Sequence, residues 1–374
     1  RLSSGLACCL LALAAGCGGE SAAPSEAGGE PGAAQPAVFE AKVPPLPAVV
    51  AASAAEASQL QMVEERLWQT GSDDRLKSSY LHSIAVSDTM VAAGGDAGEL
   101  VLFDVETGAE RKTLAGIEAQ IGAVAFSPDG KWVAAGGGDR NPIPAIFELA
   151  VWDPATGEQK MGVREQKDPI LSLAFSPGSS TLVGGRFASS AALWDVAQGK
   201  LRLEMDKPPV IKEWAFAPDG SLLAGLGFLE TTVLLYTADG KIKQELKLNA
   251  DEAGGCCFTP AGDVFLVSLA DESSEKTTRV DFYSTKTWEV VEKLENIPTG
   301  RGGLCMSHDG RYLIVWGVGT GSDIVVYDYA ARKLLGSIGP PFGGSYYRVI
   351  HHPRKPILVY HDYNSVGAIR YAEE

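Results

Sequence analysis

The stretch Val124-Ala125-Phe126-Ser127-Pro128-Asp129-Gly130, followed by the apolar segment Trp132-Val133-Ala134-Ala135, decides the fold of this chain. Its first half alternates small and large residues, which favours a β-strand. Pro fixes the backbone angle φ and Gly tolerates a positive φ, so Pro-Asp-Gly is expected to close a hairpin. The whole stretch therefore predicts two short antiparallel strands joined by a tight turn.

The same unit returns along the chain at intervals of 40 to 49 residues. The residue equivalent to Phe126 is called the anchor of each copy. The anchors are Val86, Phe126, Phe175, Phe216, Phe258, Met306 and His351. A second motif, an aromatic residue followed by Asp, Thr or Ser, comes after each of the first six anchors. The six pairs are Phe103-Asp104, Trp152-Asp153, Trp194-Asp195, Tyr236-Thr237, Tyr283-Ser284 and Tyr327-Asp328. This spacing suits about four short strands per copy, and one copy cannot bury both of its faces alone.

These motifs resemble the WD-repeat β-propeller family, over roughly residues 62–374. The resemblance implies an all-β fold, a seven-bladed WD-repeat-like β-propeller, with six or eight blades as the alternatives. The Gly-His pair that the family carries before each inner strand is absent, and Gly116-Ile117 stands near one expected place. We therefore expect the blades to pack through apolar contacts rather than through the family's buried polar network.

The last copy has room for three strands only, at about 346–352, 356–362 and 365–371. Its fourth strand is expected from the N-terminal side, at residues 62–69, so that the two ends of the domain close the ring. Ser53-Ala54-Ala55-Glu56 has the pattern of a capping box, and Leu60, Val63 and Leu67 follow at helical spacing. A short helix over 54–63 is therefore predicted before the closing strand.

The N-terminal segment is predicted to direct export. Leu6 to Ala15 form an apolar run that is too short to span a bilayer. Leu13-Ala14-Ala15-Gly16-Cys17 resembles a bacterial lipobox, although Ala14 departs from the commoner Leu, and the resemblance implies acylation of Cys17. Cleavage after Ala14 with release of a soluble protein is the alternative. Three segments follow: a signal peptide at 1–16, a lipid-anchored disordered linker at 17–50, and the propeller at 51–374.

Charge and motif content bound the function. The formal net charge is −15, so a nucleic-acid partner is not expected. No catalytic residues, metal site or cofactor are predicted, because metal-protease, phosphate-loop and nucleophile-elbow motifs are missing. His351, His352 and His361 fall in one blade, but His351 and His352 should point to opposite faces of a strand. Cys257 and Cys305 are interpreted as small buried residues on inner strands, and a bridge between them is left open.

The candidate binding face is formed by the loops at one end of the propeller. Two connections within blades, Asp139 to Glu148 and Asp271 to Thr278, are long, and extra loop length on a rigid scaffold is often functional. Two connections between blades, Lys207 to Trp214 and Pro340 to Arg348, are rich in proline or aromatic residues. The candidate binding residues are Arg140, Asn141, Phe342, Tyr346, Tyr347 and Arg348. The alternative is that they merely pack over the ends of the blades.

The predicted function is a non-catalytic protein-protein interaction scaffold, lipid-anchored in a bacterial cell envelope, with unknown protein partners. Gly18 follows the acylated position, where Asp would resemble an inner-membrane retention signal, so we expect the outer membrane. Two alternatives remain. One is a propeller enzyme of the lactonase or quinone-dependent dehydrogenase type, and the other is an outer-membrane assembly subunit.

Overall fold

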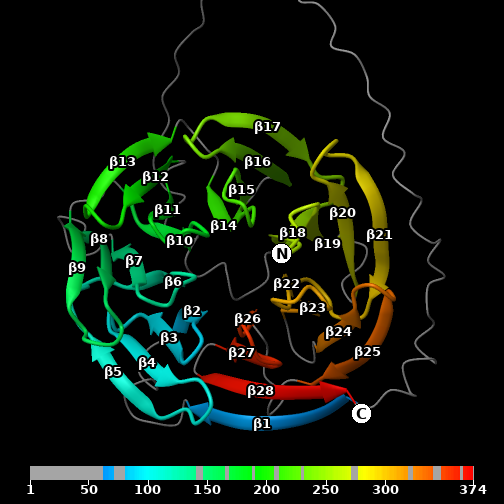
Figure 1. The fold of residues 1–374 in the computed structure, drawn as a ribbon, viewed down its shortest axis with the longest axis horizontal. Coiled ribbons are helices and arrows are strands. Elements are labelled where there is room, and N and C mark those ends of the chain that lie inside the picture. The colour runs from blue at the N-terminus through cyan, green and yellow to red at the C-terminus, as the bar shows by residue number, and fades with distance from the viewer. Residues whose placement is uncertain are drawn as a thin grey trace, which may run out of the picture. The chain divides into compact units, whose positions relative to one another are not determined.

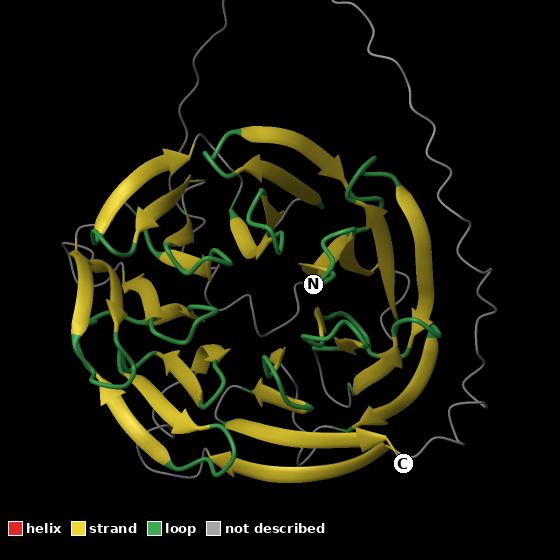
Figure 2. Ribbon diagram, viewed as in Figure 1, coloured by secondary structure: helices red, strands yellow, loops and turns green. Residues whose placement is uncertain are grey.

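The computed structural model describes residues 62–70, 81–139, 146–164, 168–187, 190–205, 210–228, 231–270, 277–318, 323–339, 347–362 and 365–373. Within these ranges every regular element is a β-strand, and none is a helix (Figure 2). The strands form seven sheets of four strands each, which stand around a common centre (Figure 1). The predicted seven-bladed β-propeller is confirmed.

Each blade has an inner, a second, a third and an outer strand, counted from the centre. The inner strands are β2 (Leu81–Val86), β6 (Ile121–Phe126), β10 (Ile170–Phe175), β14 (Ile211–Phe216), β18 (Glu252–Phe258), β22 (Leu304–Met306) and β26 (Arg348–His351). The second strands are β3 (Met90–Gly95), β7 (Val133–Asp139), β11 (Thr181–Arg186), β15 (Leu222–Gly227), β19 (Val264–Ala270), β23 (Tyr312–Trp316) and β27 (Ile357–His361).

The remaining two strands complete each blade toward the rim. The third strands are β4 (Leu100–Asp104), β8 (Ile146–Trp152), β12 (Ser190–Asp195), β16 (Thr232–Thr237), β20 (Thr278–Ser284), β24 (Ile324–Asp328) and β28 (Val366–Glu373). The outer strands are β5 (Glu110–Leu114), β9 (Gln159–Arg164), β13 (Lys200–Met205), β17 (Ile242–Lys247), β21 (Val290–Ile297), β25 (Lys333–Ile338) and β1 (Met62–Thr70). Blade 1 contains β2 to β5, and blade 7 contains β26, β27, β28 and β1.

The ring closes through the N-terminal strand. β1 pairs antiparallel with β28 from Met62 opposite Glu373 to Thr70 opposite Val366, which confirms the predicted closing strand. The predicted helix over 54–63 is wrong at residues 62 and 63, which belong to β1, and its other residues lie outside the described part. Backbone hydrogen bonds to β28 supply a long-range partner that local helical spacing cannot reveal.

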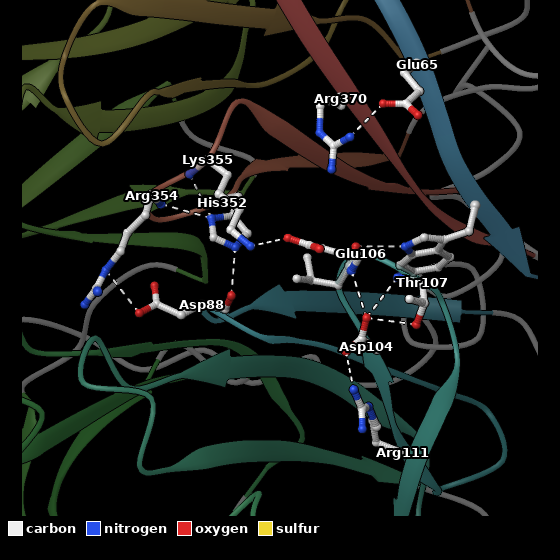
Figure 3. A network of polar contacts seen from close by, with 12 residues as sticks. Glu65, Asp88, Asp104, Glu106, Thr107, Arg111, His352, Arg354, Lys355 and Arg370 are labelled. Carbon is white, nitrogen blue, oxygen red and sulfur yellow. Dashed lines mark hydrogen bonds and ion pairs between the residues drawn. The ribbon is translucent and has the colours of Figure 1, made fainter.

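Polar contacts reinforce this closure between blades 7 and 1 (Figure 3). The Trp68 indole nitrogen donates to the Val105 carbonyl oxygen at 2.8 Å. From the hairpin of blade 7, Lys355 pairs with Glu106, Arg354 lies 3.1 Å from Asp88, and His352 contacts the Asp88 carbonyl oxygen at 3.0 Å. The three contacts from the blade 7 hairpin join chain segments that are more than 240 residues apart, so they hold the ring shut.

Apolar packing between blades supplies the core. The buried apolar side chains form seven clusters, one between each pair of neighbouring blades. The second strands contribute most of their residues to these clusters, because blades cover both faces of each sheet. Third-strand aromatic residues fill the gaps, and Trp152, Trp194 and Tyr236 are fully buried. The expected apolar packing is therefore confirmed for these blades.

Candidate interaction surface at the ring centre

The two ends of the propeller differ in their connections. In blade 1, Leu81 at the start of the inner strand pairs with Gly95 at the end of the second strand. Leu100 at the start of the third strand pairs with Leu114 at the end of the outer strand. Connections from second to third strands and from blade to blade therefore lie at one end, called the loop face. The repeated Ser-Pro-Asp-Gly turns lie at the other end, called the turn face.

The inner strands carry a β-bulge close to the loop face. The pairing with the second strand shifts register between Leu81 and Ser83, and equivalent shifts occur in the next three blades. The residues at the bulge in these blades are His82, Gly122, Leu171 and Lys212. Bulges redirect side chains and are common beside functional sites. Here they set the direction of the residue that follows, at the centre of the ring.

That following residue stands three positions before the anchor of each copy. The seven residues, called the central positions, are Ser83, Ala123, Ser172, Glu213, Gly255, Gly303 and Arg348. Several of them bond to the next blade. The Ser83 hydroxyl accepts from the Val124 backbone N–H at 3.1 Å, and the Ser172 hydroxyl donates to the Ile211 carbonyl oxygen at 2.7 Å. Small polar side chains at this position therefore connect neighbouring inner strands.

Glu213 extends the same pattern in blade 4 and adds a second contact. Its Oε2 accepts from the Cys256 backbone N–H of blade 5 at 3.0 Å, in the way that Ser83 accepts from Val124. Its Oε1 lies 3.5 Å from a guanidinium nitrogen of Arg348. The inner strands pack mainly against those of the neighbouring blades, and β14 and β26 stand on opposite sides of the centre (Figure 1). The Glu213–Arg348 ion pair therefore spans the centre of the propeller.

Other polar side chains surround this pair. The Tyr347 ring stacks on His361, with ring centroids 6.2 Å apart, and burial lowers the pKa of His361 to about 4. On blade 1, His82 lies 2.5 Å from an Asp96 carboxylate oxygen. The Lys212 ammonium donates to the Ala253 carbonyl oxygen, and burial lowers its pKa. The loop face thus combines a stacked aromatic residue with charged groups of both signs around the centre.

The three cysteines of the described residues are free thiols on inner strands or beside them. Cys257 and Cys305 lie on inner strands as predicted, but they are half-buried rather than fully buried, and they form no bridge. Burial raises the pKa of Cys305 to about 12 and raises the pKa of Cys256 and Cys257 as well. A thiol held protonated in this way is a poor nucleophile, so these residues act in packing.

His351, the last residue of β26, and His352, the residue after the strand, behave as structural groups. His351 contacts the Tyr371 hydroxyl at 2.7 Å, and burial lowers its pKa to about 4. The His352 Nδ1 accepts from the backbone N–H groups of Arg354 and Lys355 at 2.9 and 3.0 Å. Across the ranges that the structure describes, no group of three or more His, Cys, Asp or Glu side chains could hold a metal ion. The same ranges hold no helix long and apolar enough to cross a membrane.

Of the predicted binding residues, Tyr347 and Arg348 lie at the centre of the loop face, where they contact His361 and Glu213. The other four, Arg140, Asn141, Phe342 and Tyr346, lie outside the described residues, as does Cys17. The predicted blade connection from Lys207 to Trp214 ends earlier, because β14 begins at Ile211. Sequence reasoning missed Glu213. Aligning the seven copies on their anchors would have shown two opposite charges among small residues.

Comparison with known proteins identifies a WD repeat in the chain. A family model described as "WD domain, G-beta repeat" matches residues 108–141. Protein tipD of Dictyostelium discoideum is 32% identical over 92 residues, which are 25% of this chain and 14% of that protein. The small ribosomal subunit protein RACK1 of Caenorhabditis elegans is 31% identical over 123 residues, 31% of this chain and 34% of that protein. The chain thus matches about a third or less of the length of these relatives.

Proposed function

We propose that this chain is a non-catalytic protein-interaction scaffold that presents its loop face to a polypeptide partner. The observation that carries the proposal is that the residues of the turn face repeat from blade to blade, whereas those at the centre of the loop face do not all repeat. Residues that repeat from copy to copy, such as Ser127 and Gly130, form the tight turns of the turn face. At the central positions of the loop face, by contrast, Glu213 and Arg348 break a pattern of small residues. A non-repeating surface on a rigid frame is what specific recognition needs.

Site-specific photocrosslinking in living cells tests this proposal. A photoreactive residue is placed in the full chain at Gln120 or Asn249, which are exposed on the loop face. Matched positions on the turn face are the exposed residues Lys131 and Asp219. The proposal expects one defined protein adduct from the loop-face positions only. Equal adducts from both faces, or none from the loop face, would contradict it.

We also propose that the propeller is tethered by lipid to a bacterial envelope, with the outer membrane as the expected site. The support is the apolar run that ends in Leu13-Ala14-Ala15-Gly16-Cys17, together with Gly18 at the next position. A Gly-, Ala- and Pro-rich stretch follows to residue 50 and suits a flexible linker. Such a tether would hold the scaffold close to envelope partners.

Intact-mass spectrometry of the membrane-extracted protein tests the tether. The proposal expects a mature N-terminus at Cys17 that carries acyl mass, and a Cys17→Ala variant that lacks this mass and leaves the membrane fraction. Fractionation of inner and outer membranes then assigns the site. An unmodified chain that starts near Ala15 in the soluble fraction would overturn the tether and leave the loop-face proposal standing.

A further inference from the structure

Arg348 differs from every other central position of the ring. Five of the seven are Ser, Ala or Gly, and Glu213 is the one acidic member. The Arg348 side chain is 42% exposed to solvent, whereas the Glu213 side chain is 20% exposed. A long cationic side chain thus stands at the centre of the loop face among residues too small to cover it.

The contact between Arg348 and Glu213 leaves the guanidinium able to form further and stronger hydrogen bonds. A guanidinium carries five N–H donors, and its strong pairs with carboxylates are bidentate at about 2.7–2.9 Å. The Glu213 contact is a single one at 3.5 Å. Elsewhere in the propeller, Arg332 shows the strong geometry, because its two contacts to Glu292 measure 2.8 and 2.9 Å. The Arg348 pair is loose by comparison and can be replaced.

Glu213 is held in place by a different contact, which explains why the pair stays loose. Its Oε2 accepts from the Cys256 N–H at 3.0 Å, so the carboxylate is anchored on blade 5. Moving toward Arg348 would break that bond. Both Glu213 oxygens already have donors, so a cationic ligand gains little there. Among the described residues, the exposed partner with donors to spare is the arginine, and its complement is an anion.

We infer that Arg348 receives a carboxylate of an acidic polypeptide segment at the centre of the loop face, where that carboxylate replaces Glu213 as the partner of the guanidinium. The inference rests on the proposed function, because it specifies the chemistry of the partner on the same face. Without a partner, Glu213 partly neutralises Arg348. With a partner, two short charge-assisted hydrogen bonds replace one long contact. Tyr347, stacked on His361 beside Arg348, supplies a flat apolar surface for the same segment.

Fluorescence anisotropy with a labelled hexaglutamate peptide tests the inference on the full chain. The wild type should bind hexaglutamate and not hexaglutamine. Arg348→Ala should weaken binding about tenfold or more. Glu213→Gln should strengthen it several-fold, because the competing charge is removed while the amide oxygen still accepts from Cys256 N–H. Opposite shifts in these two variants are the signature of the exchange.

Arg301→Ala is the matched control, since Arg301 lies in a blade connection of the same face, is 38% exposed and pairs with Glu252 at 3.1 Å. It should bind hexaglutamate like the wild type. Equal losses in Arg301→Ala and Arg348→Ala would reduce the effect to general charge attraction and overturn the site. Binding of inorganic phosphate with the same dependence on Arg348, without binding of hexaglutamate, would overturn the carboxylate assignment. If hexaglutamate fails while loop-face crosslinks persist, this inference fails and the scaffold function stands.

Discussion

Trp288 occupies the turn position in blade 5 that Gly157 occupies in blade 2, and both residues have a left-handed backbone, with φ of 59° and 82°. In each turn the residue donates its N–H to the carbonyl oxygen four positions earlier, from Trp288 to Ser284 and from Gly157 to Asp153, both at 2.7 Å. A bulky residue is strained in this conformation by about 1–2 kcal/mol. The buried Trp288 ring offsets the strain by packing on Phe258 and Phe265, with centroids 6.4 and 5.9 Å away.

This strain predicts that the Trp288→Gly variant is more stable than the Trp288→Ala variant, which reverses the usual order of Gly and Ala. Trp288→Ala should lower the free energy of unfolding by about 3–5 kcal/mol, because a buried aromatic side chain is lost. Trp288→Gly loses the same ring but relaxes the backbone, so it should be about 1 kcal/mol more stable than the Ala variant. Urea unfolding measures both. At the exposed strand residue Lys243, the matched pair of variants should show Ala as the more stable one. If the Ala variant has the higher free energy of unfolding at both sites, the proposed strain at Trp288 is refuted.

Gly108 is expected to be essential for ring closure for a steric reason. A Cβ at Gly108 would lie 2.5 Å from the Trp68 ring, whereas a Cβ at Gly199 would lie 3.7 Å from its nearest neighbour. The two φ angles are nearly equal, 68° and 64°, so Gly199→Ala controls for backbone strain. Gly199→Ala should cost about 1 kcal/mol. Gly108→Ala should cost at least about 1 kcal/mol more, because Trp68 must move away from the Val105 carbonyl oxygen.

Thermal unfolding compares the two variants, and limited proteolysis reports whether β1 detaches from the ring. Gly108→Ala should release β1 sooner than Gly199→Ala does. Equal melting temperatures and equal cleavage would show that the Trp68 contact contributes nothing to closure.

The strands and turns that repeat from blade to blade could be predicted from the sequence. Turn signals recur at fixed places, and apolar strands between them must be covered on both faces, so the blade number followed from local patterns. The closing strand followed from the missing fourth strand of the last copy and from the family resemblance. Conformations within the turns were harder to predict. The motif Pro177-Gly178 suggests a left-handed glycine, yet in blade 3 the left-handed residue is Ser179, with φ of 60°. Its hydroxyl accepts from the Asp129 N–H of blade 2 at 3.2 Å, a contact between blades that no local pattern contains.

The candidate site was only half visible in the sequence for a similar reason. Arg348 was selected because aromatic residues surround it in the chain. Glu213 lies 135 residues earlier, and its link to Arg348 depends on the ring, which places blades 4 and 7 on opposite sides of the centre. Periodicity assigns a residue to a strand and a level in the blade. Which two blades meet across the centre follows only from the closed ring.

Stability should fall as the pH drops through the range of histidine titration. Burial lowers the pKa of His351 and of His361 to about 4, below the unfolded value of about 6.5, and burial lowers the pKa of His352 in the same direction. The unfolded chain therefore binds protons first, between about pH 6.5 and 4. The stabilisation is fully present above pH 6.5 and is lost as the pH falls, by up to about 1.4 kcal/mol per pH unit for each histidine.

Unfolding free energies measured at several pH values, each referred to the same protein at pH 7.5, test this dependence. In the His361→Gln variant, the slope of unfolding free energy against pH between 6.5 and 4.5 should fall by the share that His361 contributes. A wild-type profile without slope in this window, or a slope that His361→Gln leaves unchanged, would show that the histidine is not kept neutral by burial.

Glu213 should contribute to stability through the Cys256 backbone rather than through Arg348. Glu213→Ala removes the acceptor of the Cys256 N–H, and a buried donor left without a partner costs about 1–3 kcal/mol. Glu213→Gln keeps an acceptor and loses only a partly exposed ion pair, so it should cost less than about 1 kcal/mol. Ser83→Ala, which removes the acceptor of the Val124 N–H at the same level of blade 1, should resemble Glu213→Ala. Urea unfolding together with hydrogen exchange at the Cys256 amide measures this difference. If Gln proves as costly as Ala and the amide stays protected in both, the stabilising contact is the ion pair across the centre and not the bond between blades.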